Sequence, residues 1–213
     1  MFSRAVARTK TAPRRAPRQK RAEDTVTFLL DATELVLARH GFAAATTNRI
    51  ACATGVSIGT LYHYFPSKEA LIEAVVHRMW ARELAAVQVH APLLFEGRLE
   101  DAVRAFVGAL VGVMLPRVEL YRRWYAEASH LGQLGLGLGM SSQAIELLRR
   151  ALEHRGQAIR PRNLEFAADL VVKTALAVVR TGARDYEPQA RSGELAEELT
   201  QMLVRYLLVD PKA

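Results

Sequence analysis

The residues whose types and spacing best suggest a chemistry lie in one stretch, TTNRIACATGVSIGTLYHYFPSK, which runs from Thr46 to Lys68. Gly55 is suited to break a short helix, Ser57 can cap a second one, and Pro66 ends it. Two short helices joined in this way form a helix-turn-helix, whose second helix usually reads base edges in the major groove of DNA. The stretch therefore indicates DNA binding rather than catalysis.

The second short helix is expected to have an inner and an outer face. Leu61 and Phe65 are four residues apart, so both should point towards the protein interior. The outward positions are then Ile58, Gly59, Tyr62 and His63. Gly59 costs about 1 kcal/mol of helix propensity relative to alanine. In return, a small residue in the first turn lets the backbone approach a ligand closely.

Cys52 is the only thiol, and it lies beside this helix. A redox switch is one interpretation, but a reactive thiol needs a lowered pKa, and Arg49 is the only positive charge nearby. The alternative is a small, half-buried residue without chemistry. A single cysteine also excludes an intramolecular disulfide, which fits a reducing cytoplasm.

No other group of residues in the sequence has the spacing that a nucleotide-binding loop or a metal site requires. The segment GQLGLGLGM, residues 132–140, has Met140 where a nucleotide-binding loop would need its third glycine, and no strand precedes it. It is expected to be a mobile loop near a pocket mouth or a plain connector. The histidines are too scattered for a metal site: His77, His90, His130 and His154. We therefore expect no catalytic residue, no metal and no cofactor, and a protein that is not an enzyme.

The positive charge of the chain is concentrated at its start. The 213 residues carry a formal charge of +7, yet residues 1–22 contain eight lysines and arginines and no acid. With Pro13 and Pro17 and few large apolar groups, this basic arm should be disordered in isolation. It can lie on DNA phosphates or in the minor groove, remain a solvated tail, or be a transit peptide. The longest apolar run, 105–115, is too short to span a membrane.

The remaining segments are expected to be helices, which predicts an all-α fold. One helix should run over 24–40 and end at Gly41. A long helix over 67–89 should link the helix-turn-helix to a larger body. The body helices are expected over 102–115, 118–130, 141–155, 163–180 and 192–208. We divide the chain into a basic arm (1–22), a helix-turn-helix domain (23–66), and a helical ligand-binding and dimerisation domain (67–213).

Large apolar residues in the body are candidates for an effector cavity, since such cavities are mostly apolar with a few polar groups. The alternative for each is ordinary helix core. The candidates are Trp80, Phe106, Leu110, Met114, Tyr121, Trp124 and Tyr125.

The last two helices each carry a one-sided apolar stripe. In the last one it comprises Leu195, Leu199, Met202, Leu203, Tyr206 and Leu207. The stripes can pack on the body of their own chain or on a second copy. We favour the second, because two reading helices one DNA turn apart bind a palindrome, whereas one alone binds weakly.

The order Thr-Thr, Ile-Ala, Gly-Val-Ser and Thr-Leu-Tyr-His-Tyr-Phe-Pro-Ser-Lys-Glu-Ala-Leu resembles the DNA-binding domain of TetR-type repressors over residues 24–75. The resemblance implies an all-helical homodimer that pairs through its last two helices. Binding of a small, apolar effector in each body would then release a palindromic operator in double-stranded DNA. Cys52 and Ala53 depart from the family pattern, which usually has charged residues there.

Carried over position by position, the pattern implies that the residues facing DNA are Thr47, Asn48, Ser57, Ile58, Gly59, Thr60, Tyr62, His63 and Lys68. Asn48, Ile58, Gly59 and His63 would meet base edges, and Thr47, Thr60, Tyr62 and Lys68 would mainly hold phosphates. Some of them, Ser57 above all, can instead serve only as caps. Two other functions stay open: a constitutive DNA-binding protein without an effector, and a small-molecule binder or enzyme whose head has lost DNA function.

Overall fold

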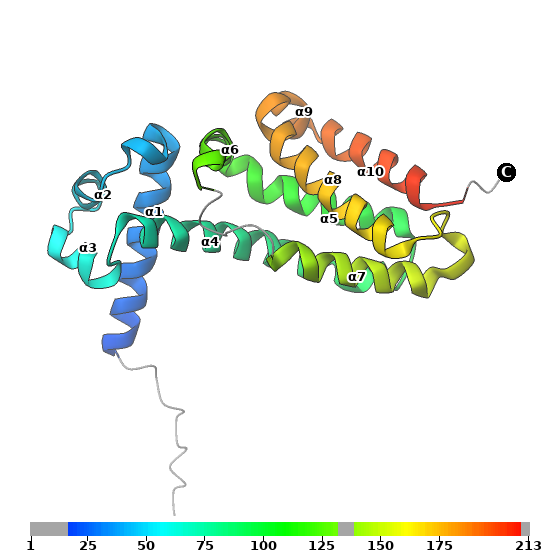
Figure 1. Ribbon diagram of the computed structural model, residues 1–213, viewed down its shortest axis with the longest axis horizontal. Helices are drawn as coiled ribbons and strands as arrows, with labels where there is room; N and C mark the ends of the chain where they lie inside the picture. Colours follow the sequence, from blue (N-terminus) through cyan, green and yellow to red (C-terminus); the bar gives the residue numbers. More distant parts are fainter. Residues whose placement is uncertain (1–16, 132–138, 210–213) are drawn as a thin grey trace, which may run out of the picture.

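The computed structural model describes residues 17–131 and 139–209, and within these ranges the chain is built from helices (Figure 1). An isolated antiparallel bridge between Ile159 and Leu208 is the β-type pairing recorded there. The all-α prediction is confirmed. The helices are α1 Pro17–Ala44, α2 Thr47–Thr54, α3 Ile58–Tyr64, α4 Lys68–Gln88, α5 Leu99–Met114, α6 Val118–Leu131, α7 Gly139–Arg155, α8 Leu164–Asp185, α9 Glu187–Ser192 and α10 Glu194–Leu207.

The first three helices form a small head at one end of the molecule (Figure 1). Its core contains Leu29, Leu37, Ile50 and Leu61, all fully buried. Helix α1 begins at Pro17, so residues 17–22 of the predicted arm are helical. Proline fits the first turn of a helix, and the glutamine, lysine and arginine that follow are good helix formers. At Gly41 the backbone leaves the helical region (φ 78°, ψ 172°), as expected for a stop signal.

Helix α4 leaves the head and runs into the body, where it packs on α5, and α7, α8 and α10 make up the rest of the body (Figure 1). Most body helices begin and end within three residues of their predicted bounds, but α8 runs five residues past its predicted end at 180, and the short helix α9 was not predicted. Pro116 ends α5, and a short 3-10 turn, Leu115–Arg117, leads directly into α6. Two further 3-10 turns, Ala91–Leu94 and Gly156–Ala158, follow α4 and α7. In the described ranges, no helix is both long enough and apolar enough to cross a membrane.

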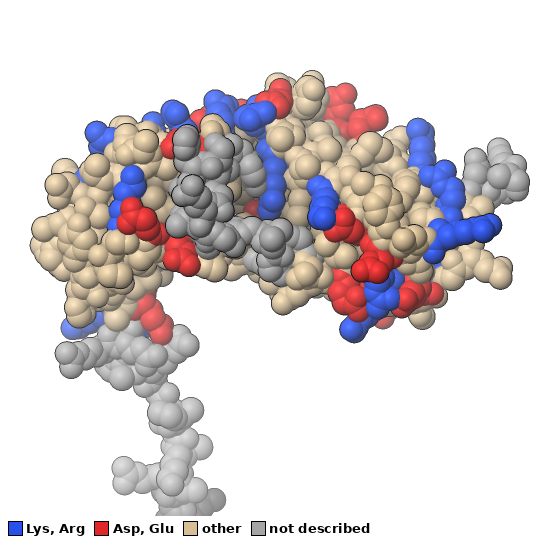
Figure 2. Space-filling view, in the orientation of Figure 1, with Lys and Arg blue, Asp and Glu red and all other residues tan. Residues whose placement is uncertain are grey.

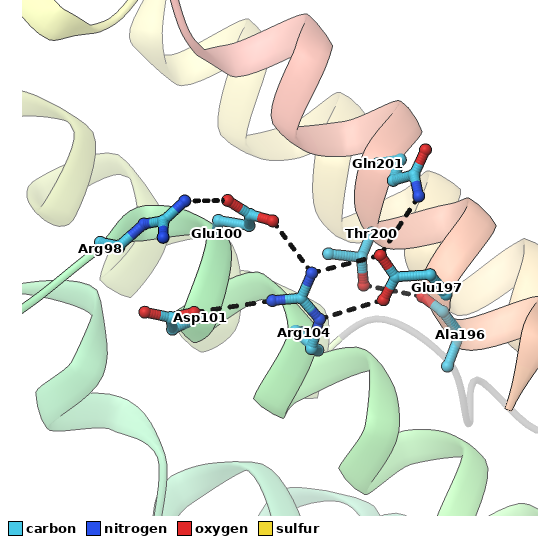
Figure 3. Close-up of polar contacts among 8 residues, drawn as sticks. All are labelled: Arg98, Glu100, Asp101, Arg104, Ala196, Glu197, Thr200 and Gln201. Carbon is cyan, nitrogen blue, oxygen red and sulfur yellow. Dashed lines mark hydrogen bonds and ion pairs between the residues drawn. The ribbon is translucent and has the colours of Figure 1, made fainter.

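Helices α5 and α10 are joined by a cluster of charged residues (Figure 3). Arg104 on α5 donates from Nε to Glu197 Oε2 on α10 over 3.0 Å and from Nη2 to Glu100 Oε1 over 2.9 Å. The hydrogen bond from Arg104, helped by one from Gln201, lowers the pKa of Glu197. These contacts fix one side of α10 to its own body, so the exposed side of α10 is the one left for other contacts.

Candidate nucleic-acid interface and effector cavity

The helix that the sequence predicts to read DNA is held at both ends as expected. The Ser57 hydroxyl accepts the N–H of Thr60 at 3.0 Å, and Gly55 adopts the left-handed conformation with φ 69°. At the other end, the Phe65 N–H donates to the Leu61 carbonyl at 2.9 Å. Ser57 therefore caps α3, which is the role that the sequence left open beside DNA contact, and a cap of this kind contributes about 1 kcal/mol.

The residues predicted to face DNA lie on α2, α3 and the start of α4. The Thr47 and Tyr62 hydroxyls are 3.2 Å apart, so α2 and α3 present one continuous surface. The Ser57 and Thr60 hydroxyls are 2.8 Å apart. Thr47, Thr60 and Lys68 are half-buried, and the exposed members are Asn48, Ser57, Ile58, Gly59, Tyr62 and His63.

Two cations of the head turn back onto its own backbone. Lys68 Nζ donates to the Ala43 carbonyl at 3.3 Å, and Arg49 Nη1 donates to the Ala44 carbonyl at 2.8 Å. On the face shown in Figure 2, basic and acidic side chains are interspersed, without a single basic patch on the head. Cys52 is exposed on α2, not half-buried as the simpler expectation had it. Residues 1–16 of the basic arm lie outside the described ranges.

The body contains a cavity of about 490 Å³. Its walls come mainly from α4, α5, α7 and α8, with Leu94 and Leu203 completing them. The volume falls in the range of small-molecule sites, which is roughly 300–1,000 Å³. Most lining side chains are aliphatic or aromatic, so the cavity suits a largely apolar molecule.

The structure divides the predicted cavity residues into two groups. Trp80, Phe106 and Leu110 line the cavity. Met114, Tyr121 and Trp124 are buried in other contacts and do not line it, and the Tyr125 side chain lies outside the described residues. The ring of Trp124 packs edge-on against Phe42 of the head, with 5.4 Å between ring centroids. An apolar stripe cannot distinguish these outcomes, because it shows which side of a helix is buried but not which neighbour covers it.

Sequence reasoning missed the charged pair in the cavity wall. Glu83 on α4 is only 4% exposed, and its carboxylate accepts from the Tyr121 hydroxyl at 3.0 Å and from Arg180 Nη2 on α8 at 3.1 Å. A signal was present, since Glu83 interrupts an apolar series that repeats every four residues, Val75, Met79 and Val87. Such an acid is nearly always paired when buried, which makes its partner part of the site.

Two family models match the chain. The model for bacterial regulatory proteins of the tetR family matches residues 29–75, and a tetracyclin repressor-like C-terminal domain matches residues 99–207. The second match alone covers more than half of the 213 residues. The chain belongs to the TetR family of transcriptional regulators. TetR-family regulators bind DNA and dimerise, and both the head and the body of this chain fit that family.

Among curated relatives, the HTH-type transcriptional regulator UidR of Escherichia coli K12 is 40% identical over 67 residues. This match covers 32% of the chain and 34% of UidR, so it spans only about a third of that relative. The nucleoid occlusion factor SlmA of Haemophilus ducreyi is 47% identical over 45 residues, which are 21% of the chain and 22% of SlmA. Sequence similarity to these TetR-type proteins is therefore limited to a fraction of each chain.

Solved structures extend the likeness to the whole fold. GusR of Salmonella enterica has a TM-score of 0.64 and 27% identity, with 86% of this chain and 95% of GusR covered. A TetR-family regulator of Mesorhizobium loti has a TM-score of 0.67, with 89% of this chain and 99% of that one covered. At 20% identity, the second likeness shows the fold alone.

A buried acid joins the TetR-type head to the body. Glu34 on α1 accepts from Arg78 Nε at 2.8 Å and from Arg82 Nη1 at 2.7 Å, both on α4. Its other oxygen, Oε2, lies 3.6 Å from Arg117 Nε, which stands just before α6. One carboxylate thus holds α1, α4 and the 3-10 turn before α6 together.

A second acid holds the end of α1 against α6. Glu127 Oε2 accepts the backbone N–H groups of Phe42 at 3.0 Å and Ala43 at 3.1 Å. These contacts directly follow the break at Gly41. In this TetR-family chain, α4 and α6 therefore both carry contacts to the head, and α4 also carries Glu83 in the cavity wall.

Proposed function

We propose that the protein is a TetR-type transcriptional repressor that binds a palindromic DNA operator as a symmetric dimer and leaves it when a small, apolar effector binds. The observation that carries the proposal is the capped helix α3. It exposes Ile58, Gly59, Tyr62 and His63 on a head connected through α4 to a cavity of about 490 Å³. A cavity of this size supports regulation by a ligand over constitutive DNA binding.

The proposed mechanism uses α4 as the lever. Arg82 and Glu83 are adjacent on α4, yet Arg82 binds Glu34 of the head and Glu83 pairs with Arg180 in the cavity wall. An effector that shifts α4 at the cavity also moves Arg82, and Arg82 binds Glu34 of the head. Its effect on DNA binding is limited to the difference between its affinities for the two states of the dimer.

The function is tested by selecting binding sites for the full-length protein from random double-stranded oligonucleotides. We expect enrichment of a two-fold symmetric sequence whose half-sites lie about one helical turn, roughly 34 Å, apart. Enrichment of no sequence, or only of unsymmetric single sites, contradicts the proposal. A transcription assay on the selected site then distinguishes repression from activation.

Two neighbouring residues of α3 are expected to behave differently. Tyr62→Ala removes a proposed phosphate contact and should weaken binding to all sequences by a similar factor, about tenfold. His63→Ala removes a proposed base contact and should change the preferred sequence at one position, worth about 1–3 kcal/mol. Gel-shift titrations of the selected site and its single-base variants measure both effects. Operator binding by both variants equal to that of the parent protein counts against the proposed orientation of α3.

We also propose that the dimer forms through α8 and α10. Phe166 on α8 is 59% exposed and Met202 on α10 is 49% exposed, and Leu170 is a further exposed apolar residue on α8. The double variant Phe166→Glu and Met202→Glu should sediment as a monomer at micromolar concentration, because it places charges in an apolar interface. Phe28→Glu, on the exposed side of α1, is the matched control and should stay dimeric. A dimeric double variant refutes this choice of helices.

A further inference from the structure

The charges in the cavity wall balance. Among the described residues that line the cavity, Glu83 is the one acidic residue and Arg180 is the one arginine. No aspartate or lysine is among these lining residues. The polar residues beside them, Gln88 and Gln143, are neutral amides, and the side chain of His77 is mostly exposed next to Glu73. The wall therefore carries one negative and one positive formal charge within an apolar surround.

The Glu83 and Arg180 side chains pair with each other in the cavity wall. Arg180 Nη2 lies 3.1 Å from Glu83 Oε2, and the Tyr121 hydroxyl holds Glu83 Oε1 at 3.0 Å. A ligand carboxylate at Arg180 would stand beside the Glu83 carboxylate, and a ligand ammonium at Glu83 would stand beside the Arg180 guanidinium. Either ion would lose its hydration without gaining a partner of its own, and a buried charge without a partner is strongly disfavoured.

A neutral ligand avoids this conflict. A hydroxyl or carbonyl group can hydrogen-bond to the wall without breaking the pair, and its desolvation is far less costly than that of an ion. The rest of such a molecule would lie on Trp80, Phe106 and the aliphatic lining. The cavity volume of about 490 Å³ lies within the range of sites for small organic molecules, roughly 300–1,000 Å³.

We propose that the Glu83–Arg180 pair makes this cavity select neutral, largely aromatic or aliphatic molecules that carry a hydroxyl or carbonyl group, and reject carboxylates and amines of the same skeleton. The inference depends on the proposed function in one respect: it assumes that the molecule bound in the cavity is the effector. The selectivity itself is a property of the cavity wall and can be measured without DNA.

The test compares three probes that share a skeleton: 4-biphenylmethanol, biphenyl-4-carboxylate and 4-biphenylmethylamine. Calorimetric titration of the full-length protein at neutral pH should give the alcohol an affinity at least about tenfold above that of either ion. Glu83→Gln leaves Arg180 without its counter-charge, so the carboxylate should gain about tenfold relative to the alcohol. Arg180→Gln leaves Glu83 with the Tyr121 hydroxyl but without its counter-charge, so the amine should gain by a similar factor. Lys173→Gln, in an exposed ion pair with Asp169, is the control and should keep the parent order.

Tighter binding of either ion than of the alcohol by the parent protein overturns the proposal, and so does binding of none of the three at millimolar concentration. The proposal is also overturned if the folded Glu83→Gln and Arg180→Gln variants bind the three probes in the same order of affinity as the parent protein. If a variant does not fold, the order of the three probe affinities in the parent protein decides the test by itself. Operator binding with and without the alcohol is measured separately. If the cavity binds the alcohol selectively but DNA affinity does not change, the proposed selectivity of the cavity is supported and the proposal that its occupant is the effector is contradicted.

Discussion

Replacing Glu34 with alanine should lower the free energy of unfolding by about 3 kcal/mol, because it removes the anion that two largely buried arginines share. The Glu34 side chain is 11% exposed, and Arg78 and Arg82 both donate to its Oε1 atom. Without it, the guanidinium groups would stay between α1 and α4 with less counter-charge. Urea unfolding of parent and variant measures the difference.

Asp31 provides the matched control for Glu34. It lies on the same helix and pairs with the same arginine, at 2.8 Å from Arg78 Nη1, but its side chain is 60% exposed. An exposed pair contributes about 0–1 kcal/mol, so Asp31→Ala should cost no more than that. Equal losses for the two variants would show that burial of the Glu34 carboxylate does not stabilise the junction between head and body.

Replacing Gly41 with alanine should cost about 3 kcal/mol or more, while the same change at Gly55 should cost about 1 kcal/mol. Both glycines have positive φ, 78° and 69°, which alanine adopts only at a cost. They differ in their surroundings: a Cβ at Gly55 meets no atom within 4 Å, whereas one at Gly41 would lie 2.5 Å from Glu127 Oε1. The Glu127 side chain would have to move and give up its hydrogen bonds to Phe42 and Ala43, each of which involves a charged acceptor.

A double-mutant cycle separates the two contributions. In a Glu127→Ala background the clash is already gone, so Gly41→Ala should cost about 1–2 kcal/mol less than in the parent protein. Gly55→Ala should cost the same in both backgrounds. Additivity at Gly41 would mean that the Glu127 carboxylate does not hold the end of α1.

The sequence predicted the local features of the head well, because caps and breaks depend on neighbouring residues. Ser57 caps α3 as predicted, and Ser67 and Asn163, the first residues of two predicted helices, cap α4 and α8. Gly55 takes the expected left-handed conformation. The start of α1 at Pro17 was not foreseen, since the charge and prolines of residues 1–22 outweighed the good helix formers near its end.

Contacts between distant segments could not be predicted in the same way. Glu127 lies 84 and 85 residues from the amide groups that it binds, and Glu83 lies 97 residues from Arg180. Periodicity placed Tyr121 and Trp124 on a buried helix face. It could not predict whether these side chains would line the cavity or pack on the head. Glu83 and Glu34 each interrupt an apolar series that repeats every four residues, a signal that the sequence-based predictions did not use.

The position of the Glu34 carboxylate has a consequence for protein engineering. A chimaera that takes its reading domain from another regulator and is spliced at Pro66 would keep Arg78 and Arg82 but lose the acid that both of them bind. A crossover placed after Arg82 would transfer the acid and both arginines together, so that among the Glu34 contacts only the one with Arg117 would cross the splice. The exchangeable unit of this chain therefore extends about four turns into α4, beyond the point where the helix-turn-helix itself ends.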